Sequence, residues 1–392
     1  MLCKNKTNIN KKHWILLSNM KYKIAVFPGD GVGPELINEG IKVIEKAAEL
    51  DKFEVEWLKY PHGAEHYLET KELLSEKILK KIKNSCNAIY CGTFDNSVAG
   101  FSNISNLIRN YFDQFVCLRP IKLLPSVECP LAGKAHNEIN FVIIRENSED
   151  FYIRASGRAK NGKNRHQLEI NKGALKVKFG LNIETKGNEI AYQMGVLSRK
   201  GCEKVVKYAF EYAKRKNKSK IVSVDKANLM DCYSLWRESF DKIGKEYNGI
   251  EHGFEFIDAT VINFIRQPEK YQIIVAPNMF GDILSDLGTI IQGGLLFAAG
   301  GNINPEGISM FEPVHGSAAK LKGQGIVNPI ATIWAGALML DAIGQQESSD
   351  LIIKAIEAVL KEGRTRTQDL DGNNTTSEMG DAIVDKLIEI HD

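Results

Sequence analysis

The sequence is short of several features that would identify a class of protein at once. Its 392 residues contain no run close to the ~20 apolar residues that span a membrane. Lys and Arg exceed Asp and Glu by only 51 − 49 = 2, so neither nucleic acid nor a membrane surface is indicated as a partner. The seven cysteines include no C-x-x-C pair, which argues against a zinc ribbon or a disulfide scaffold and favours free thiols in a reducing cytoplasm.

The first 19 residues also lack the marks of a targeting segment. Their one apolar run, Trp14–Leu17, is shorter than the ~7–15 residues of a signal-peptide core, and they contain no Arg. We expect a solvated, flexible tail, with folding to begin near Met20. A cytoplasmic location is the expectation that follows.

The remaining composition is that of a folded globular protein, with 43% hydrophobic and 26% charged residues over a length that suits two domains. Strand-like runs alternate with helical periodicity, which predicts an α/β fold with a largely parallel sheet and helices on both faces. The expected strands are Lys23–Phe27, Ala88–Gly92, Asn140–Arg145, Lys220–Asp225, Phe254–Asp258 and Gln272–Ala276, and the expected helices are Glu35–Leu50, Cys202–Lys214, Ile330–Leu340, Leu351–Leu360 and Met379–Ile390.

One segment, Ile153–Tyr192, interrupts this rhythm. It is polar, rich in glycine and contains only short alternating runs. Such a pattern predicts an excursion of hairpins rather than a third domain.

Three arginines stand in apolar surroundings, namely Arg109, Arg119 and Arg145. A guanidinium in such a place needs an anion, because burying it alone is costly, and it binds carboxylates through two hydrogen bonds. Together the three indicate a ligand with several carboxylates. The alternative for each arginine taken alone is an internal ion pair with Glu146, Glu149 or Asp150.

Carboxylates recur near the ends of predicted strands. Asp282 and Asp286 are four residues apart, so on a helix both share one face. Asp258 is expected at the end of a parallel strand, where the sites of α/β proteins gather. Three carboxylates suit one Mg²⁺ or Mn²⁺, although a solvated acidic helix start has the same spacing.

Two loops suit phosphate-bearing ligands. Gly29–Pro34 (GDGVGP) follows the first strand but lacks G-x-G-x-x-G spacing, so it is either a tight turn or a ligand loop. Glu312–Ala318 (EPVHGSA) leads to the helix Ile330–Leu340, whose N-terminus suits a phosphate or adenine. Lys226 and Tyr152 are candidate proton-transfer groups. The alternatives are that Lys226 is only a surface charge and that Tyr152 is only a phenol packed in the core.

Together these motifs resemble those of the metal-dependent decarboxylating dehydrogenases of the isocitrate/isopropylmalate dehydrogenase family. The resemblance runs from about Met20 to the C-terminus. It is carried by PGDGVGPE (28–35), LRP (118–120), REN (145–147), DKAN (225–228), FGDILSD (280–286), EPVHGSA (312–318) and NP (328–329).

The resemblance implies a two-domain α/β fold whose parallel or mixed sheet is flanked by helices. Residues 20–114 and 280–392 would form a large cofactor-binding domain. Residues 115–279 would form a smaller domain with the dimer interface and a clasp at about 153–192. The implied homodimer shares its active sites, each taking Lys226 and Asp258 from the partner subunit.

The resemblance also implies the role of each candidate residue. Lys226, helped by Asp258, would take the hydroxyl proton of a hydroxy di- or tricarboxylate, and Tyr152 would protonate the enolate left by decarboxylation. The substrate would contact Arg109, Arg119, Arg145, Asn103 and Ser105, the Mg²⁺ or Mn²⁺ would contact Asp258, Asp282 and Asp286, and the nucleotide would contact Glu312, His315, Gly316, Ser317, Ala318, Lys320 and Asn328.

The choice between NADP and NAD depends on few residues. Lys320 suits the 2′-phosphate of NADP, whereas Leu321 departs from the tyrosine of NADP-type isocitrate enzymes. Asp369 stands where those enzymes have a second cation. We expect NADP ahead of NAD.

The choice of substrate depends on residues 102–106 (SNISN). They are polar where isopropylmalate enzymes place leucines, so a branched alkyl group is disfavoured. Asn103 and Ser105 resemble isocitrate dehydrogenases with their order exchanged, whereas Phe112–Phe115 and Cys129–Gly133 resemble the tartrate/D-malate branch. We expect isocitrate, with D-malate, tartrate or homoisocitrate as alternatives and a non-catalytic regulatory subunit as a less favoured one.

Overall fold

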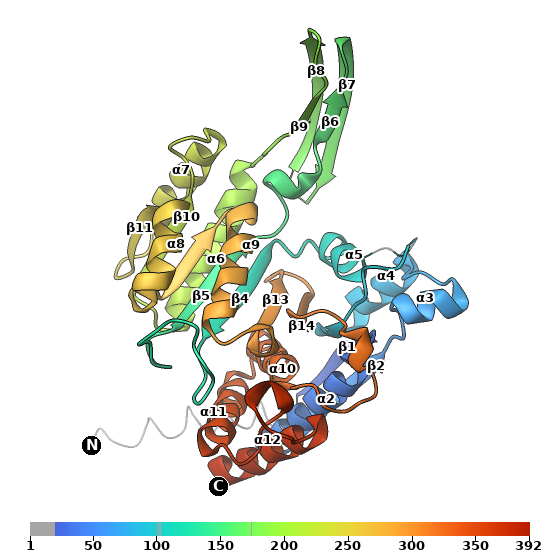
Figure 1. Cartoon of the computed structure of the whole chain (residues 1–392), viewed down its shortest axis with the longest axis vertical. Helices are drawn as coiled ribbons and strands as arrows, with labels where there is room; N and C mark the ends of the chain where they lie inside the picture. The colour runs from blue at the N-terminus through green and yellow to red at the C-terminus, as the bar shows by residue number, and fades with distance from the viewer. Residues whose placement is uncertain (1–19, 100, 102, 174) are drawn as a thin grey trace, which may run out of the picture.

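The computed structural model describes residues 20–392 apart from residues 100, 102 and 174, so the predicted tail at 1–19 lies outside the described residues. The chain forms one ten-stranded mixed sheet flanked by helices, with a β arm that projects from it (Figure 1). The strand order is β11-β10-β12-β5-β4-β13-β14-β3-β1-β2. The predicted α/β class is confirmed.

One half of the sheet holds parallel strands from both ends of the chain. The strands are β1 (Lys21–Gly29), β2 (Glu54–Lys59), β3 (Ala88–Thr93) and β14 (Ser309–Pro313). The helices on this side are α2 (Gly33–Asp51), α3 (Ala64–Thr70), α4 (Glu76–Ser85), α5 (Ile104–Tyr111), α10 (Ile330–Ala342), α11 (Gln346–Glu362) and α12 (Thr376–His391). The face of α2 predicted from its apolar spacing is buried, including Ile37, Ile41 and Ile44.

The other half is also parallel. Its strands are β5 (Asn140–Glu146), β10 (Lys220–Asp225), β11 (Glu251–Phe256) and β12 (Ile273–Ala276). Its helices are α6 (Arg199–Arg215), α7 (Cys232–Gly244), α8 (Ile257–Arg266) and α9 (Asn278–Ile291). Strand β11 ends at Phe256, so Asp258 lies in the first turn of α8 and not at a strand end as expected.

The two halves meet at strands that the sequence pattern did not indicate. Strands β4 (Val116–Lys122) and β13 (Ala299–Ile303) pair antiparallel with each other, with β5 and with β14. Pro120 and the glycines at 300 and 301 weaken the strand pattern in this region. We propose that the β4–β13 ladder marks the junction of the two predicted domains.

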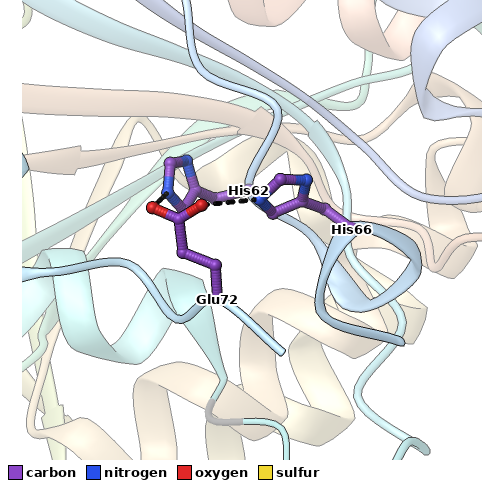
Figure 2. A group of neighbouring side chains, drawn as sticks. All are labelled: His62, His66 and Glu72. Atoms are coloured by element: carbon purple, nitrogen blue, oxygen red, sulfur yellow. Dashed lines mark ion pairs between the residues drawn. The ribbon is translucent and has the colours of Figure 1, made fainter. Parts of the chain in front are cut away.

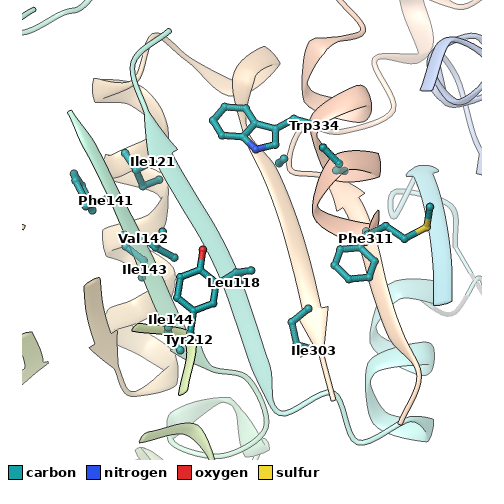
Figure 3. Close-up of a cluster of buried hydrophobic side chains, with 14 of the residues drawn as sticks. Leu118, Ile121, Phe141, Val142, Ile143, Ile144, Tyr212, Ile303, Phe311 and Trp334 are labelled. Carbon is teal, nitrogen blue, oxygen red and sulfur yellow. The ribbon is translucent and has the colours of Figure 1, made fainter. Parts of the chain in front are cut away.

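The hydrophobic core crosses this junction (Figure 3). Leu118 and Ile121 on β4 belong to the same buried cluster as Ile143 on β5, Ile303 on β13 and Trp334 on α10. Because side chains from both halves share one core, the strands that carry the candidate site are held in a common frame.

The predicted hairpins at Ile153–Tyr192 are confirmed. Antiparallel β6 (Ser156–Ala159) and β9 (Ile190–Gln193) form one pair, and β7 (Gly162–Lys172) and β8 (Leu175–Thr185) form another. The arm extends away from the body (Figure 1). In the described part of the chain, no helix is both long and apolar enough to cross a membrane.

Candidate active site

The three arginines converge from neighbouring elements. Arg109 is in the last turn of α5, Arg119 is on β4, and Arg145 is on β5, where it pairs with Cys117 of β4. Residues far apart in sequence therefore present their guanidinium groups to one region of the sheet.

Arg109 is held by a buried carboxylate from β14. Its Nη2 lies 2.9 Å from Oε1 of Glu312, and Ser105 Oγ donates to Oε2 of the same carboxylate at 2.9 Å. Asn302 completes the set with a 2.9 Å bond. Burial alone would raise the pKa of Glu312, but Arg109, Arg119 and Ser105 outweigh it and hold that pKa below its usual value. We expected Glu312 to contact the nucleotide. In the structure it instead contacts Arg109, one of the three arginines predicted to bind the substrate.

Arg145 is fixed by the first two turns of α9. Its Nε and Nη2 donate to Oδ1 of Asn278 at 2.8 and 2.6 Å, and Nη1 contacts Asp282. Tyr152 donates from its hydroxyl to Oδ2 of Asp282 at 2.9 Å. A Cβ at Gly281 would lie 2.7 Å from the Arg145 side chain, so glycine is needed here for the helix to approach the strand.

Arg119 is the one of these three arginines that has no carboxylate partner among the described residues. Its Nε donates to Cys117 Sγ at 3.2 Å, while Nη1 is buried without a hydrogen-bond partner in that part of the chain. Gly300 leaves room for the guanidinium, since a Cβ there would lie 3.0 Å from Cζ. Burial raises the pKa of Cys117, but Arg119 and Arg145 outweigh it and lower that pKa. An unsatisfied guanidinium of this kind suits an anionic ligand.

The acidic residues considered as partners of the arginines have other contacts. Glu146 accepts from Ser148 and Glu149 backbone amides, Glu149 from Ser198, and Asp150 from Tyr233 and Met279. The internal ion pairs expected with these three residues are therefore wrong. The observed partners are Glu312 for Arg109 and Asp282 for Arg145.

Asp282 and Asp286 share one face of α9, as their spacing predicts. Burial and the neighbouring charge of Asp282 raise the pKa of Asp286. A divalent cation between the carboxylates would relieve that repulsion, so this oxygen pair fits Mg²⁺ or Mn²⁺.

Lys226 and Asp258 form a separate unit. Lys226 Nζ contacts Oδ2 of Asp258, and the lysine holds the pKa of that exposed carboxylate below its usual value. Across the described residues, no hydrogen bond or ion pair joins this pair to Arg145, Asp282 or Asp286. Among the described residues of one chain, the side-chain oxygens of Asp258, Asp282 and Asp286 do not all lie within 4.8 Å of one another.

The loop that follows Glu312 lies beside the Gly29–Pro34 turn. His315 is buried with Nε2 unpartnered among the described residues, and burial lowers its pKa. Gly316 has free space around its Cβ position, and Ala318 adopts φ +41°. Lys320 is exposed, whereas Asn328 is buried, donates to Asp369 at 2.9 Å and caps α10 at Ile330.

The Gly29–Pro34 loop is a tight turn that supports this region. Gly31 has φ +60°, and a Cβ there would lie 2.1 Å from the carbonyl oxygen of Ser317. Val32 N donates to that same oxygen at 3.0 Å. The turn therefore fixes the position of Ser317.

Several contact residues gave no usable signal in the sequence. Cys117, Asn278 and Asn302 each bind a predicted site residue, yet each comes from an element or position that has no motif of its own. Asn103, predicted at the substrate, accepts from Asn106 N at 2.8 Å and caps α5.

Comparison with known proteins agrees with this architecture. A sequence model described as isocitrate/isopropylmalate dehydrogenase matches residues 23–383. The chain is 36% identical over 380 residues to the decarboxylating D-malate dehydrogenase of Escherichia coli (strain K12), covering 92% of this chain and 97% of the relative. It is 34% identical over 391 residues to a tartrate dehydrogenase/decarboxylase of Pseudomonas putida, covering 94% and 98%.

A solved structure shows the same fold. The crystal structure of isocitrate dehydrogenase from Methylococcus capsulatus matches with a TM-score of 0.77 and 30% identity over 93% of this chain and 99% of that one. The chain therefore belongs to the isocitrate/isopropylmalate dehydrogenase family, whose members are NAD(P)- and divalent-metal-dependent decarboxylating dehydrogenases, and it is an oxidoreductase.

Proposed function

We propose that this protein oxidatively decarboxylates a four-carbon hydroxydicarboxylate of the D-malate or tartrate class. The observation that carries the proposal is the state of the polar residues that favoured isocitrate. Ser105 donates its one hydroxyl proton to Glu312, so it has none left for a third carboxylate, whereas Asn103 accepts from Asn106 N through Oδ1. The buried carboxylate of Glu312 beside Ser105 would also repel one.

The relatives named for D-malate and tartrate support the same substrate class, with identities of 36% and 34%. Isocitrate is the second candidate. The isocitrate dehydrogenase of Methylococcus capsulatus is a structural neighbour at 30% identity, and Asn103, Ser105 and Asn106 are polar.

In the proposed reaction, this chain positions the substrate with arginines. Arg119, with its unpartnered Nη1, would bind one substrate carboxylate, and Arg145 would bind the other beside Asp282. The Lys226–Asp258 pair would take the proton of the 2-hydroxyl group, because Asp258 can accept the ammonium proton of Lys226 as the lysine accepts that of the substrate. After loss of the carboxylate, Tyr152 would donate its hydroxyl proton to the carbon that carried it.

Two bound groups would supply the rest of the chemistry. Asp282 and Asp286, with Asp258 of the partner subunit, would hold a divalent cation that would supply polarisation of the substrate oxygens, and the loop from His315 to Lys320 would hold a nicotinamide nucleotide that would supply a hydride acceptor. We propose NADP ahead of NAD because Lys320 is an exposed cation on the loop after His315.

We further propose a homodimer that shares its sites. The exposed apolar side chains of α8 and α9 support it, since Ile262 is 54% and Ile283 53% exposed on helices that pack together. The separation of Lys226–Asp258 from Asp282 within one chain supports it too. A cytoplasmic location is consistent with the six described cysteines, all of which are free.

The test is a rate comparison at the absorbance of reduced nicotinamide, with Mn²⁺ present and both NAD and NADP. D-malate or tartrate should give the highest kcat/KM among D-malate, tartrate, isocitrate, homoisocitrate and isopropylmalate. Highest turnover of isocitrate would overturn the argument from Ser105 and Glu312. No turnover of any of them would favour the regulatory-subunit alternative.

A further inference from the structure

A cluster of two histidines and one carboxylate lies around α3 and includes none of the arginines or aspartates of the candidate active site. His62 precedes the helix, His66 is inside it, and Glu72 follows it (Figure 2). Their potential ligand atoms all lie within 4.8 Å of one another.

His62 is buried without using its polar atoms. The residue is only 4% exposed, and both Nδ1 and Nε2 have no hydrogen-bond partner among the described residues. Nε2 of His66 is likewise buried and unpartnered there. Buried ring nitrogens normally have a partner, so two unpartnered Nε2 atoms that lie near one carboxylate indicate a missing ligand.

The spacing suits one small cation. Nε2 of His62 lies 3.9 Å from Oε1 of Glu72, and Nε2 of His66 lies 3.5 Å from Oε2 (Figure 2). Ligands around a tetrahedral zinc ion, with Zn–N and Zn–O near 2.0–2.2 Å, are about 3.4 Å apart. The His62–Glu72 pair would need to close by about 0.5 Å and the His66–Glu72 pair by about 0.1 Å, while the two histidine ligand atoms lie within 4.8 Å of each other.

The local backbone brings Glu72 to the histidines. Lys71 adopts φ +62°, a left-handed conformation that ends α3 and turns the chain back. Thr70 Oγ1 donates to the carbonyl of His66 and accepts from Glu72 N, which fixes the turn. Burial and the neighbouring His66 lower the pKa of His62, which keeps its imidazole in the neutral form that binds metals.

We propose that His62, His66 and Glu72 bind one divalent transition-metal ion of the Zn²⁺ class, with water in the fourth position. Two imidazoles and one carboxylate are a nitrogen-rich set that suits Zn²⁺ and not Mg²⁺, which prefers oxygen. The site is distinct from Asp282 and Asp286. Glu72 is exposed, so the ion can enter from solvent.

Metal binding here would stiffen the neighbourhood of the Ser317 loop. Asp30, in the turn beside that loop, accepts from the amides of Ala64 and Glu65 at the start of α3. Glu65 in turn accepts from Gly31 N and from Lys322. An ion that joins the residues before, within and after α3 therefore braces the helix that holds the turn.

The test is titration of the chelator-treated full chain with Zn²⁺ by calorimetry, in excess Mg²⁺ to fill the oxygen site. We expect one equivalent to bind, and His66→Gln and Glu72→Gln each to weaken binding at least tenfold. His136→Gln and Glu69→Gln, both at exposed positions, are the matched controls and should change affinity less than twofold.

A spectroscopic measurement separates loss of the metal site from loss of the fold. Co²⁺ in place of Zn²⁺ should give the visible absorption of a four-coordinate site in the wild type and in the controls, and Glu72→Gln, an exposed substitution, should reduce it. Absence of saturable binding would overturn the proposal. So would equal Zn²⁺ affinity in the wild type and in Glu72→Gln, since it would place the ion elsewhere.

Discussion

Arg109 and Glu312 are joined by a hydrogen bond of 2.9 Å between Nη2 and Oε1, although α5 and β14, which carry them, place them 203 residues apart in the sequence. The carboxylate is nearly buried and the guanidinium partly so. One of the three predicted substrate arginines is therefore neutralised within the chain. Arg145 is paired with Asp282, so Arg119 is the one of the three without a carboxylate partner among the described residues, and its Nη1 is buried and unpartnered there.

Replacement of the carboxylate in this pair should cost stability. We expect Glu312→Gln to lower the free energy of unfolding by about 1.5–3 kcal/mol, because Arg109 and Asn302 lose a charged acceptor. Urea denaturation measures the loss. Glu306→Gln, at an exposed position, is the control, and an equally small effect of both substitutions would contradict a structural role for the pair.

A pH dependence of stability should arise from Glu146. Burial and the charge of Glu149 raise its pKa from 4.5 to about 7. Between these values the folded chain binds a proton that the unfolded chain has lost, so the fold loses stability as pH rises through this window. The full loss is about 3 kcal/mol, from 2.5 pKa units.

Glu146→Gln should remove that loss. Its free energy of unfolding, relative to wild type, should increase between pH 5 and pH 8 in urea denaturation. Glu128→Gln, at an exposed position, should follow the wild-type profile. Parallel curves for wild type and Glu146→Gln would show that the carboxyl group does not titrate in this window.

Nucleotide choice should depend on Lys320. An acidic side chain there would repel a 2′-phosphate, so we expect Lys320→Asp to lower kcat/KM with NADP at least tenfold relative to NAD. Lys322→Gln is the matched control, because that lysine pairs with Glu65. An unchanged NADP/NAD ratio in Lys320→Asp would remove the argument for NADP.

Shared active sites predict complementation between inactive chains. Lys226→Met and Asp282→Asn should each be inactive alone. After dissociation and random reassociation, half of the dimers are mixed and each holds one intact site, so about a quarter of wild-type activity should return. Lys226→Met mixed with Asp258→Asn should regain nothing, because both residues would be lent to the same site. No recovery in the first mixture would contradict shared sites.

The sequence predicted those parts of the fold and site that depend on local pattern. Periodicity located β10 and the buried face of α2, and the spacing of Asp282 and Asp286 placed both on one face of α9. Contacts between distant elements were not foreseeable. The bond from Ser105 to Glu312 exists only because α5 lies beside β14, and it changed the substrate that the site supports best.

Strand β4 also depends on contacts between distant elements, which the local sequence pattern does not predict. Pro120 and Arg119 interrupt its apolar pattern, and antiparallel pairing with β5 and β13 stabilises it regardless. The predicted position of Asp258 at the end of a strand is also wrong. Strand β11 ends at Phe256, two residues earlier than the sequence alternation predicts, and α8 begins there.

The central claim is oxidative decarboxylation of a four-carbon hydroxydicarboxylate, and one stoichiometry tests it most directly. Purified protein with Mn²⁺, D-malate and limiting nicotinamide nucleotide should release one CO₂ and one three-carbon 2-oxo acid for each reduced nicotinamide formed. Reduced nicotinamide without CO₂, or CO₂ and reduced nicotinamide from isocitrate with none from D-malate or tartrate, would contradict it.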